Sequence, residues 1–377
     1  ISVADARIAA TVPAPRAPAS LTVPTGADLA TARGWLEQAK RPVMIVGVDA
    51  MNQWAETAIL EFAEDHNVPV ITSYKAKGML PEDHALALGG AGLSPLADTH
   101  LVPFVQSADL ILCVGYDPIE MRPGWRDVWT PDSHNVIDIT AVPNHHYMRQ
   151  SSLNFVTDCA AALRALSDGL DVVETWPEGE IYQCKSALAD AFPRDEDWGP
   201  AAIIDTCRRV LPRDAISSAD SGAHRILLSQ MWECYAPRAL MQSSALCTMG
   251  CAVPMAIGAK LASPDRAVVS FSGDAGFLMV AGELATAAEL NLAPIFVVFV
   301  DASLALIEKK QRERQLPNHG VDFAQHNFAA MGVAFGGAGV TVRSRGALES
   351  ALNDAMAADT FTVIAAVIDR GAYDGRI

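Results

Sequence analysis

Two apolar runs that each end at an aspartate constrain the fold of this chain more than any other feature. Residues 268–272 and 294–300 have the length and composition of buried strands, and they lead into GDAG (273–276) and DAS (301–303). Buried apolar strands are typical of parallel sheets covered by helices on both faces. Because parallel strands end at a common edge, we expect Asp274 and Asp301 to lie close together.

Similar alternation of strands and helices recurs in two blocks, which predicts an α/β fold with two doubly wound, mainly parallel-sheet domains. The first block has expected helices at 28–40 and 54–66 and expected strands at 42–48, 68–72, 107–115 (after a helix end) and 135–139. The second block has expected helices at 201–210, 252–261 and 281–290 and strands at 267–272, 294–300 and 361–367, with AISSAD (215–220) and MQSSALCTMG (241–250) before them.

The composition of the connecting segments predicts the domain boundaries. Residues 1–22 are rich in Pro, Ala and Thr and are expected to be an extended connector, so we expect a further segment to precede it. A central α/β domain is expected at 23–170, and an acidic, Pro-containing linker at 171–196. The second α/β domain then occupies 197–377.

Bulk charge and cysteine usage exclude several classes of protein. The 377 residues carry a formal net charge of −16, which disfavours binding to nucleic acid or to an anionic membrane surface. No apolar run approaches the roughly 18 residues that a membrane-spanning helix needs. The seven cysteines include no CxxC pair, a pattern that favours a reducing, cytoplasmic location.

The two aspartates suit a hard divalent cation. Mg²⁺ takes a few protein oxygens and completes its octahedron with phosphate oxygens and water. The small residues Gly273, Ala275 and Gly276 would let backbone N–H groups approach a phosphate at the start of the following helix. A metal between two carboxylates and a diphosphate would remove the charge conflict among them.

At this point the sequence resembles a known family. Gly273-Asp274 followed by Asp301 resembles the thiamine-diphosphate (ThDP) signature that opens with GDG and closes with Asn-Asn, and ELATAAELNLAPIFVVFV (283–300) resembles its acetolactate synthase version. TMGCAVPMAIGAKLASPDRAVV (248–269) resembles the approach to that motif. RPVMIVG, VPVITSYKAKGMLPEDH and ADLILCVGYDPIE resemble the central domain of the same enzymes, so the resemblance covers nearly the whole chain.

The resemblance implies a set of ligands for ThDP and Mg²⁺. The side chains of Asp274 and Asp301 and the backbone carbonyl of Ser303 would hold the metal. The residues implied at the cofactor are Met249, which would prop it in a bent form, Gly250, Gly273, Ala275, Gly276, Ser303, Leu304, Ala305 and His224.

Four positions depart from the family pattern. Ala275 replaces the third Gly of the signature, which is tolerable if its φ is negative. Val300 replaces the first Asn, and Ala223 replaces the Gln that precedes His224. The segment Val114–Pro118 lacks the Arg that follows the strand in FAD-binding relatives, so we expect no FAD.

The resemblance also implies a partner. In this family a pyrimidine-binding domain supplies the glutamate that activates ThDP, and no such domain is recognised in this chain, so its catalytic glutamate is unknown. We therefore expect activity only in a complex with a pyrimidine-binding domain or subunit, within a homo- or hetero-oligomer (a dimer or tetramer of protomers).

Three functional hypotheses remain open. The first is a decarboxylase and carboligase that acts on a small 2-oxo acid, a transferase of the acetolactate synthase type. The second retains the cofactor in a 2-oxo-acid decarboxylase, C–C lyase or C–C hydrolase. The third is a non-catalytic scaffold or regulatory subunit with the same fold.

Simpler interpretations exist for each singled-out residue. Asp274 and Asp301 could cap helices, Met249 could be a core residue, and His224 could be an ordinary loop histidine. Cys247 and Cys251 have no second pair to complete a metal site, which favours small core residues.

Overall fold

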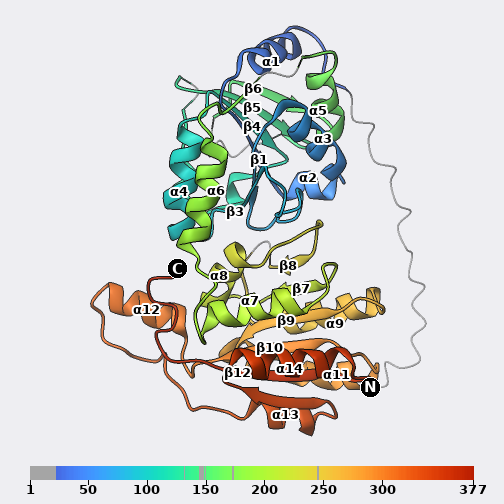
Figure 1. The fold of residues 1–377 in the computed structure, drawn as a ribbon, viewed down its shortest axis with the longest axis vertical. Coiled ribbons are helices and arrows are strands. Elements are labelled where there is room, and N and C mark those ends of the chain that lie inside the picture. Colours follow the sequence, from blue (N-terminus) through green and yellow to red (C-terminus); the bar gives the residue numbers. More distant parts are fainter. Residues whose placement is uncertain (1–22, 131, 144–147, 149, 172–173, 244–245) are drawn as a thin grey trace, which may run out of the picture.

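The computed structural model describes residues 23–130, 132–143, 148, 150–171, 174–243 and 246–377, which form two α/β units (Figure 1). The predicted connector at 1–22 lies outside the described residues. Among the described residues, no helix is both long enough and apolar enough to cross a membrane.

The central unit is a six-stranded parallel sheet with helices on both faces. Its strand order is β3 (Ala87–Ala91), β2 (Val70–Ser73), β1 (Pro42–Val46), β4 (Leu110–Val114), β5 (Asn135–Thr140) and β6 (Leu153–Val156). One face carries α1 (Ala27–Gln38), α2 (Val48–Asn52), α3 (Glu56–His66) and α5 (Cys159–Ser167); the other carries α4 (Pro95–Gln106) and α6 (Glu180–Ala191) (Figure 1).

The second unit is also a six-stranded parallel sheet. Its order is β11 (Ala338–Val342), β12 (Thr362–Val367), β10 (Ile295–Val300), β9 (Val268–Gly273), β7 (Ile216–Ala219) and β8 (Leu240–Gln242). The helices around it are α7 (Pro200–Val210), α8 (Ala223–Met231), α9 (Ala252–Ala262), α10 (Asp274–Val280), α11 (Leu284–Glu289), α12 (Ala305–Glu313), α13 (Phe328–Ala334) and α14 (Arg345–Met356). The predicted fold class, two doubly wound parallel-sheet domains, is confirmed.

Burial on both faces explains why the central strands of each sheet are continuously apolar. In β10 every residue is buried, and the side chains alternate between two clusters. Ile295, Val297 and Phe299 join the larger cluster, whereas Phe296 and Val298 join the cluster on the opposite face. A strand with two buried faces has no position for a polar, solvent-facing residue.

Several elements differ from the sequence-based expectation. The strand expected at 42–48 ends at Val46, and Gly47 is the N-cap of the short helix α2, which begins at Val48. The helix expected at 281–290 is a 3₁₀ turn (Ala281–Glu283) followed by α11. The segment predicted as a linker, 171–196, contains the twelve-residue helix α6, which packs beside α4 (Figure 1).

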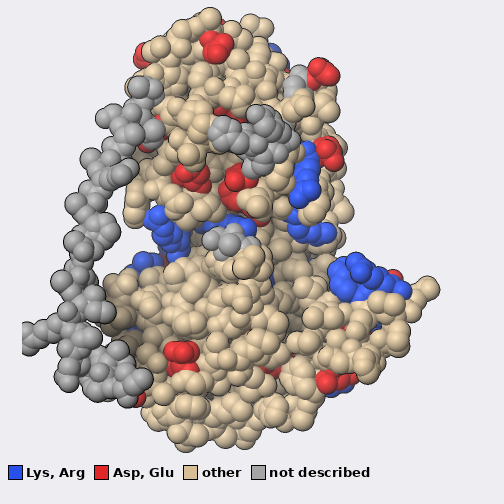
Figure 2. All heavy atoms as spheres, turned by 180° about the vertical axis from the view of Figure 1, so that it is seen from behind, with Lys and Arg blue, Asp and Glu red and all other residues tan. Residues whose placement is uncertain are grey.

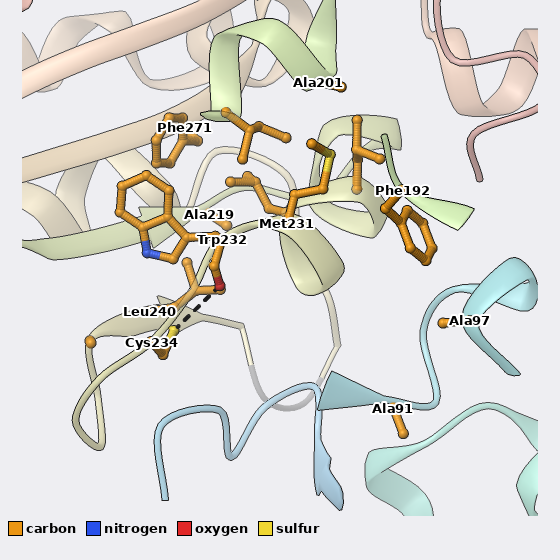
Figure 3. Packing of buried hydrophobic residues seen from close by; sticks show 14 of the residues in the cluster. Ala91, Ala97, Phe192, Ala201, Ala219, Met231, Trp232, Cys234, Leu240 and Phe271 are labelled. Carbon is orange, nitrogen blue, oxygen red and sulfur yellow. Dashed lines mark hydrogen bonds between the residues drawn. The ribbon is translucent and has the colours of Figure 1, made fainter. Parts of the chain in front are cut away.

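A single apolar cluster crosses the junction between the two units. Figure 3 shows Ala91 and Ala97 of the central unit on one side, with Met231 and Trp232 on the other and Phe192 between them. A buried ion pair lies at the same junction, where Lys77 Nζ is 2.5 Å from Glu82 Oε1 and Glu82 Oε2 accepts the Cys234 N–H at 2.8 Å. The two units are therefore joined by packed side chains.

Basic residues are prominent on the protruding helix α12 (Figure 2). Lys309 and Lys310 pair with Glu313, and Arg312 pairs with Glu308 and Asp374. The basic side chains of this helix are thus largely matched by acidic neighbours.

Candidate functional site

The candidate site lies at the carboxyl edge of the second sheet, where β7, β9 and β10 end. Strands β9 and β10 pair in parallel with Gly273 beside Phe299, so Asp274 and Asp301 leave neighbouring strands at nearly the same level. Strand β7 pairs with the other side of β9, and Asp220 follows its end. Ligands of doubly wound sheets bind outside the carboxyl ends of the strands.

Asp274 joins the two strand-end segments. Its side chain is buried, and its Oδ2 accepts the N–H groups of Ala302 at 2.7 Å and Asp301 at 3.2 Å. Its Oδ1 accepts the N–H of Ala275 at 2.8 Å. Ala302 has a φ of 55°, a left-handed conformation that this pair of hydrogen bonds helps to hold.

Asp301 is half-buried and follows the strand next to the one that Asp274 follows. Burial and the neighbouring charge of Asp274 raise the pKa of Asp301 to about 7, and burial raises the pKa of Asp274 as well. Within the part of the chain that the structure describes, no cluster of three His, Cys, Asp or Glu side chains could hold a metal. Two carboxylates at neighbouring strand ends could serve a cation whose other ligands are backbone, water or phosphate oxygens, as Mg²⁺ prefers.

A cavity in front of the two aspartates brings together almost all of the predicted site residues. Its lining includes His224, Met249, Gly273, Asp274, Ala275, Gly276, Asp301, Ser303, Leu304 and Ala305. Gly250 is not part of the lining; its N–H donates to Asp220 Oδ2 at 2.9 Å, with a φ of 81°. Gly250 therefore shapes the loop behind Met249.

His224 presents a buried nitrogen that suits an anionic ligand. The residue lines the cavity, and within the described part of the chain its Nε2 has no hydrogen-bond partner. Burial lowers the pKa of His224 to about 4, against the opposing charge of Asp220, so the ring is neutral at pH 7. The ring stacks on Phe299 with centroids 5.3 Å apart. In the tautomer that carries its proton on Nε2, this nitrogen could donate a hydrogen bond to a phosphate oxygen.

The backbone donors at the site are fewer than the sequence predicts. The Ala275 N–H donates to Asp274, and the Leu304 N–H donates to the carbonyl of Val321 at 2.8 Å. Gly276 and Ala305 lie in the first turns of α10 and α12, where N–H groups have no partner within their helix. These two remain the better candidates for a diphosphate.

Two of the departures from the family pattern are explained by local structure. Ala275 lies in the first turn of α10 and is not among the residues with positive φ, so its methyl group is accommodated. Val300 is buried in the same apolar cluster as Phe296 and Val298. Its side chain therefore packs in the core at the position where the family has a side-chain amide.

Asp220 and Tyr373 belong to the site although the sequence analysis did not name them. The Asp220 carboxylate is fully buried and accepts the N–H groups of Ser221, Gly250 and Cys251 at 2.9, 2.9 and 3.2 Å. A Cβ on Gly276 would lie 2.1 Å from its Oδ2. Asp220 follows the end of a buried strand as Asp274 does, but that strand, ISSA, contains two serines, so its apolar signal is weak. Tyr373 lines the cavity from the C-terminal segment, where no motif marks it.

The two units have the architecture of paired doubly wound domains, with a cavity at the strand ends where such domains bind ligands. Residues 29–166 match the family described as "Thiamine pyrophosphate enzyme, central domain", and residues 220–366 match "Thiamine pyrophosphate enzyme, C-terminal TPP binding domain". The chain belongs to the thiamine pyrophosphate enzyme family.

The curated relatives include several acetolactate synthases. The chain is 29% identical to acetolactate synthase of Bacillus subtilis over 346 residues, which cover 89% of this chain and 60% of that protein. It is 28% identical to the catabolic acetolactate synthase of Raoultella terrigena over 95% of this chain and 65% of the relative. It is 31% identical to the acetolactate synthase large subunit of Corynebacterium glutamicum, over 73% of this chain and 45% of that protein. The chain thus spans less than two-thirds of the length of these relatives.

Proposed function

We propose that this chain is the central and diphosphate-binding part of a ThDP- and Mg²⁺-dependent enzyme that decarboxylates a small 2-oxo acid and joins the product to a second carbonyl compound. The observation that carries the proposal is the convergence of Asp274 and Asp301 on one cavity with His224 and Gly276. The acetolactate synthases among the relatives support the reaction class.

The residues present fit this cofactor. Asp274 and Asp301, with the Ser303 carbonyl, would hold Mg²⁺, and Gly276, Ala305 and His224 would contact the diphosphate. When bound, ThDP supplies the electron sink that allows a bond beside a 2-oxo carbonyl to break or form. Met249 would support the cofactor from the Gly250 side, while Leu306 and Ile307 add apolar lining that excludes water.

The proposal includes a partner and excludes a flavin. The activating glutamate would come from a pyrimidine-binding domain or subunit, within an oligomer in the cytoplasm. The central unit supports the absence of FAD, because its strand-end turn is filled by Glu120. The Glu120 carboxylate accepts the N–H groups of Val48 at 3.0 Å and Asp117 at 3.1 Å, and also a hydrogen bond from Ser73 Oγ. These donors are engaged by Glu120, which would compete with a phosphate group for them.

Calorimetric titration of ThDP into the assembled protein tests the metal site. We expect binding with Mg²⁺ and little binding with a chelator. Asp274→Asn and Asp301→Asn should each weaken ThDP binding by about 10-fold or more, since each removes a charged metal ligand. Asp359→Asn, at an exposed carboxylate before β12, is the matched control. A ThDP dissociation constant that is unchanged by the chelator and by both substitutions would refute the proposal.

Product analysis separates the reaction types. With pyruvate alone and with pyruvate plus an acceptor aldehyde, a carboligase gives a hydroxyketone or hydroxy-oxo acid. A decarboxylase gives only the aldehyde and CO₂. A complex that binds ThDP and Mg²⁺ but forms neither product would refute a pyruvate carboligase or decarboxylase, leaving the C–C lyase or hydrolase and the scaffold alternatives.

A further inference from the structure

Residues 301–304 form a segment that we call the strand-end loop, and the guanidinium group of Arg370 holds it in place. Arg370 Nη2 donates to the carbonyl of Ala302 at 3.0 Å, and Arg370 Nε donates to the carbonyl of Asp301 at 3.3 Å. The same side chain forms an ion pair with Asp322, with Nη1 to Oδ2 at 3.2 Å. Arg370 lies just after β12, three residues beyond its last residue, Val367.

Asp322 connects the same guanidinium to the other end of the strand-end loop. Its Oδ1 accepts the Ser303 hydroxyl at 3.2 Å, and Ser303 and Asp322 form an antiparallel bridge. The backbone continues the connection on both sides of this bridge. The Leu304 N–H donates to Val321 O at 2.8 Å, and Phe323 N–H donates to Ala302 O at 3.2 Å. The loop is therefore fixed to residues 321–323, and Arg370 spans both segments.

Arg370 reaches this loop from the side away from the predicted diphosphate. Asp301 and Ser303 line both the candidate cofactor cavity and the adjoining cavity, whereas Arg370 lines the adjoining cavity and not the cofactor cavity. Its hydrogen bonds go to two backbone carbonyls and its ion pair goes to Asp322, so it does not hydrogen-bond to the Asp301 carboxylate. Arg370 would thus act on a bound metal through the loop and through its positive charge near Asp301, and the charge effect is what the Arg343 control below addresses.

We propose that Arg370 is a positioning residue that pre-forms the metal-binding loop, an inference that rests on the proposed ThDP and Mg²⁺ function. Ala302 has a φ of 55°, so the loop contains a backbone conformation that needs external support. A planar guanidinium fork can hold two adjacent carbonyls and a carboxylate at once, which an ammonium group cannot do with the same geometry. Groups that orient metal ligands commonly change metal affinity when removed.

Mn²⁺ affinity in the presence of ThDP, measured on the intact protein by electron paramagnetic resonance, is the direct test. Arg370→Met should raise the Mn²⁺ dissociation constant by about 10–100-fold. Arg370→Lys should restore part of the loss, because it returns the charge without the fork. Asp322→Asn keeps the shape of that side chain and should weaken Mn²⁺ binding in the same direction.

The matched control is Arg343→Met. Arg343 shares a cavity with Arg370 at the end of the neighbouring strand β11, and its substitution removes an equal charge there. We expect wild-type Mn²⁺ affinity in this control. Equal affinities in the Arg370→Met and Arg343→Met proteins would overturn the inference, and if Arg370→Met does not fold, wild-type affinity in both Arg370→Lys and Asp322→Asn would do so.

The same titration distinguishes the two proposals. A wild-type protein that binds neither Mn²⁺ nor ThDP would refute the proposed function and this inference with it. A wild-type protein that binds both, with unchanged affinity after Arg370→Met, would refute only the role of Arg370.

Discussion

Gly276 has no room for a side chain because the Asp220 carboxylate lies against it. An added Cβ would be 2.1 Å from Asp220 Oδ2, closer than any non-bonded contact allows. Asp220 cannot move easily, since its two oxygens accept three backbone N–H groups. The absence of a side chain at 276 is therefore a packing requirement of the site, independent of any ligand.

Gly276→Ala is expected to lower the free energy of unfolding by about 1–3 kcal/mol, the usual cost of overpacking a buried site. It should also weaken ThDP binding, because Asp220 positions Gly250 and Cys251, which directly follow Met249. Denaturant unfolding and ThDP calorimetry measure the two effects. Gly282→Ala is the control, since a Cβ there meets no atom within 4 Å. Equal stability of the two variants would contradict the assigned contact.

His224 should make stability depend on pH. Its folded pKa of about 4 lies below the ordinary 6.5 because the ring is buried, so the unfolded chain binds more protons between these values. Stability from this group is present above pH 6.5 and is lost as the pH falls towards 4, by roughly 3 kcal/mol at most. Between pH 7 and 4, the free energy of unfolding should fall more steeply with falling pH in the wild type than in His224→Gln. Parallel curves would contradict a buried, neutral His224.

The sequence was most informative where side-chain chemistry coincides with the end of an apolar strand. Asp274 and Asp301 could be predicted for that reason, and the structure places both on one cavity. Arg370 and Tyr373 could not be predicted, because they reach the site through the path of the C-terminal segment after β12. Their positions depend on tertiary folding, and no local sequence pattern indicates that they lie near the site.

At the scale of elements, the buried strands were predictable and the short or polar elements were not. β9 and β10 were expected within a residue of their observed bounds, because their apolar runs are continuous. β3 contains Gly89 and Gly90, which weaken any strand signal. α6 has no fully buried residue, and its polar composition resembles that of a linker although it packs against α4.

The segment from Lys77 to Glu82 is an element whose stability can be tested. Both side chains of its ion pair are buried, with 2% and 7% exposure. Glu82→Gln would leave the Lys77 ammonium buried without its counter-charge, so we expect a loss of about 3–5 kcal/mol in unfolding free energy. Glu64→Gln removes the more exposed carboxylate beside His84 and should cost less than about 1 kcal/mol. Similar losses in the two variants would show that the buried pair is not important for stability.

Across the whole molecule, the largest apolar cluster belongs to both units at once. It includes Ile45 and Ile111 of the central sheet together with Trp232, Phe271 and Phe299 of the second unit. Figure 3 shows the part of this cluster at the junction. A core shared in this way couples the unfolding of one sheet to that of the other.

We therefore expect one cooperative thermal transition for residues 23–377, and we expect ThDP with Mg²⁺ to raise the temperature of the entire transition. A ligand at 100 times its dissociation constant adds about 2.7 kcal/mol to the state that binds it. If the units are coupled, this free energy also protects the central unit, which contributes none of the residues that line the candidate cavity. Scanning calorimetry together with hydrogen exchange on β1 and β4 measures this protection. Two separate transitions, with only the second unit shifted by the ligand, would show that the shared cluster does not transmit stability between the units.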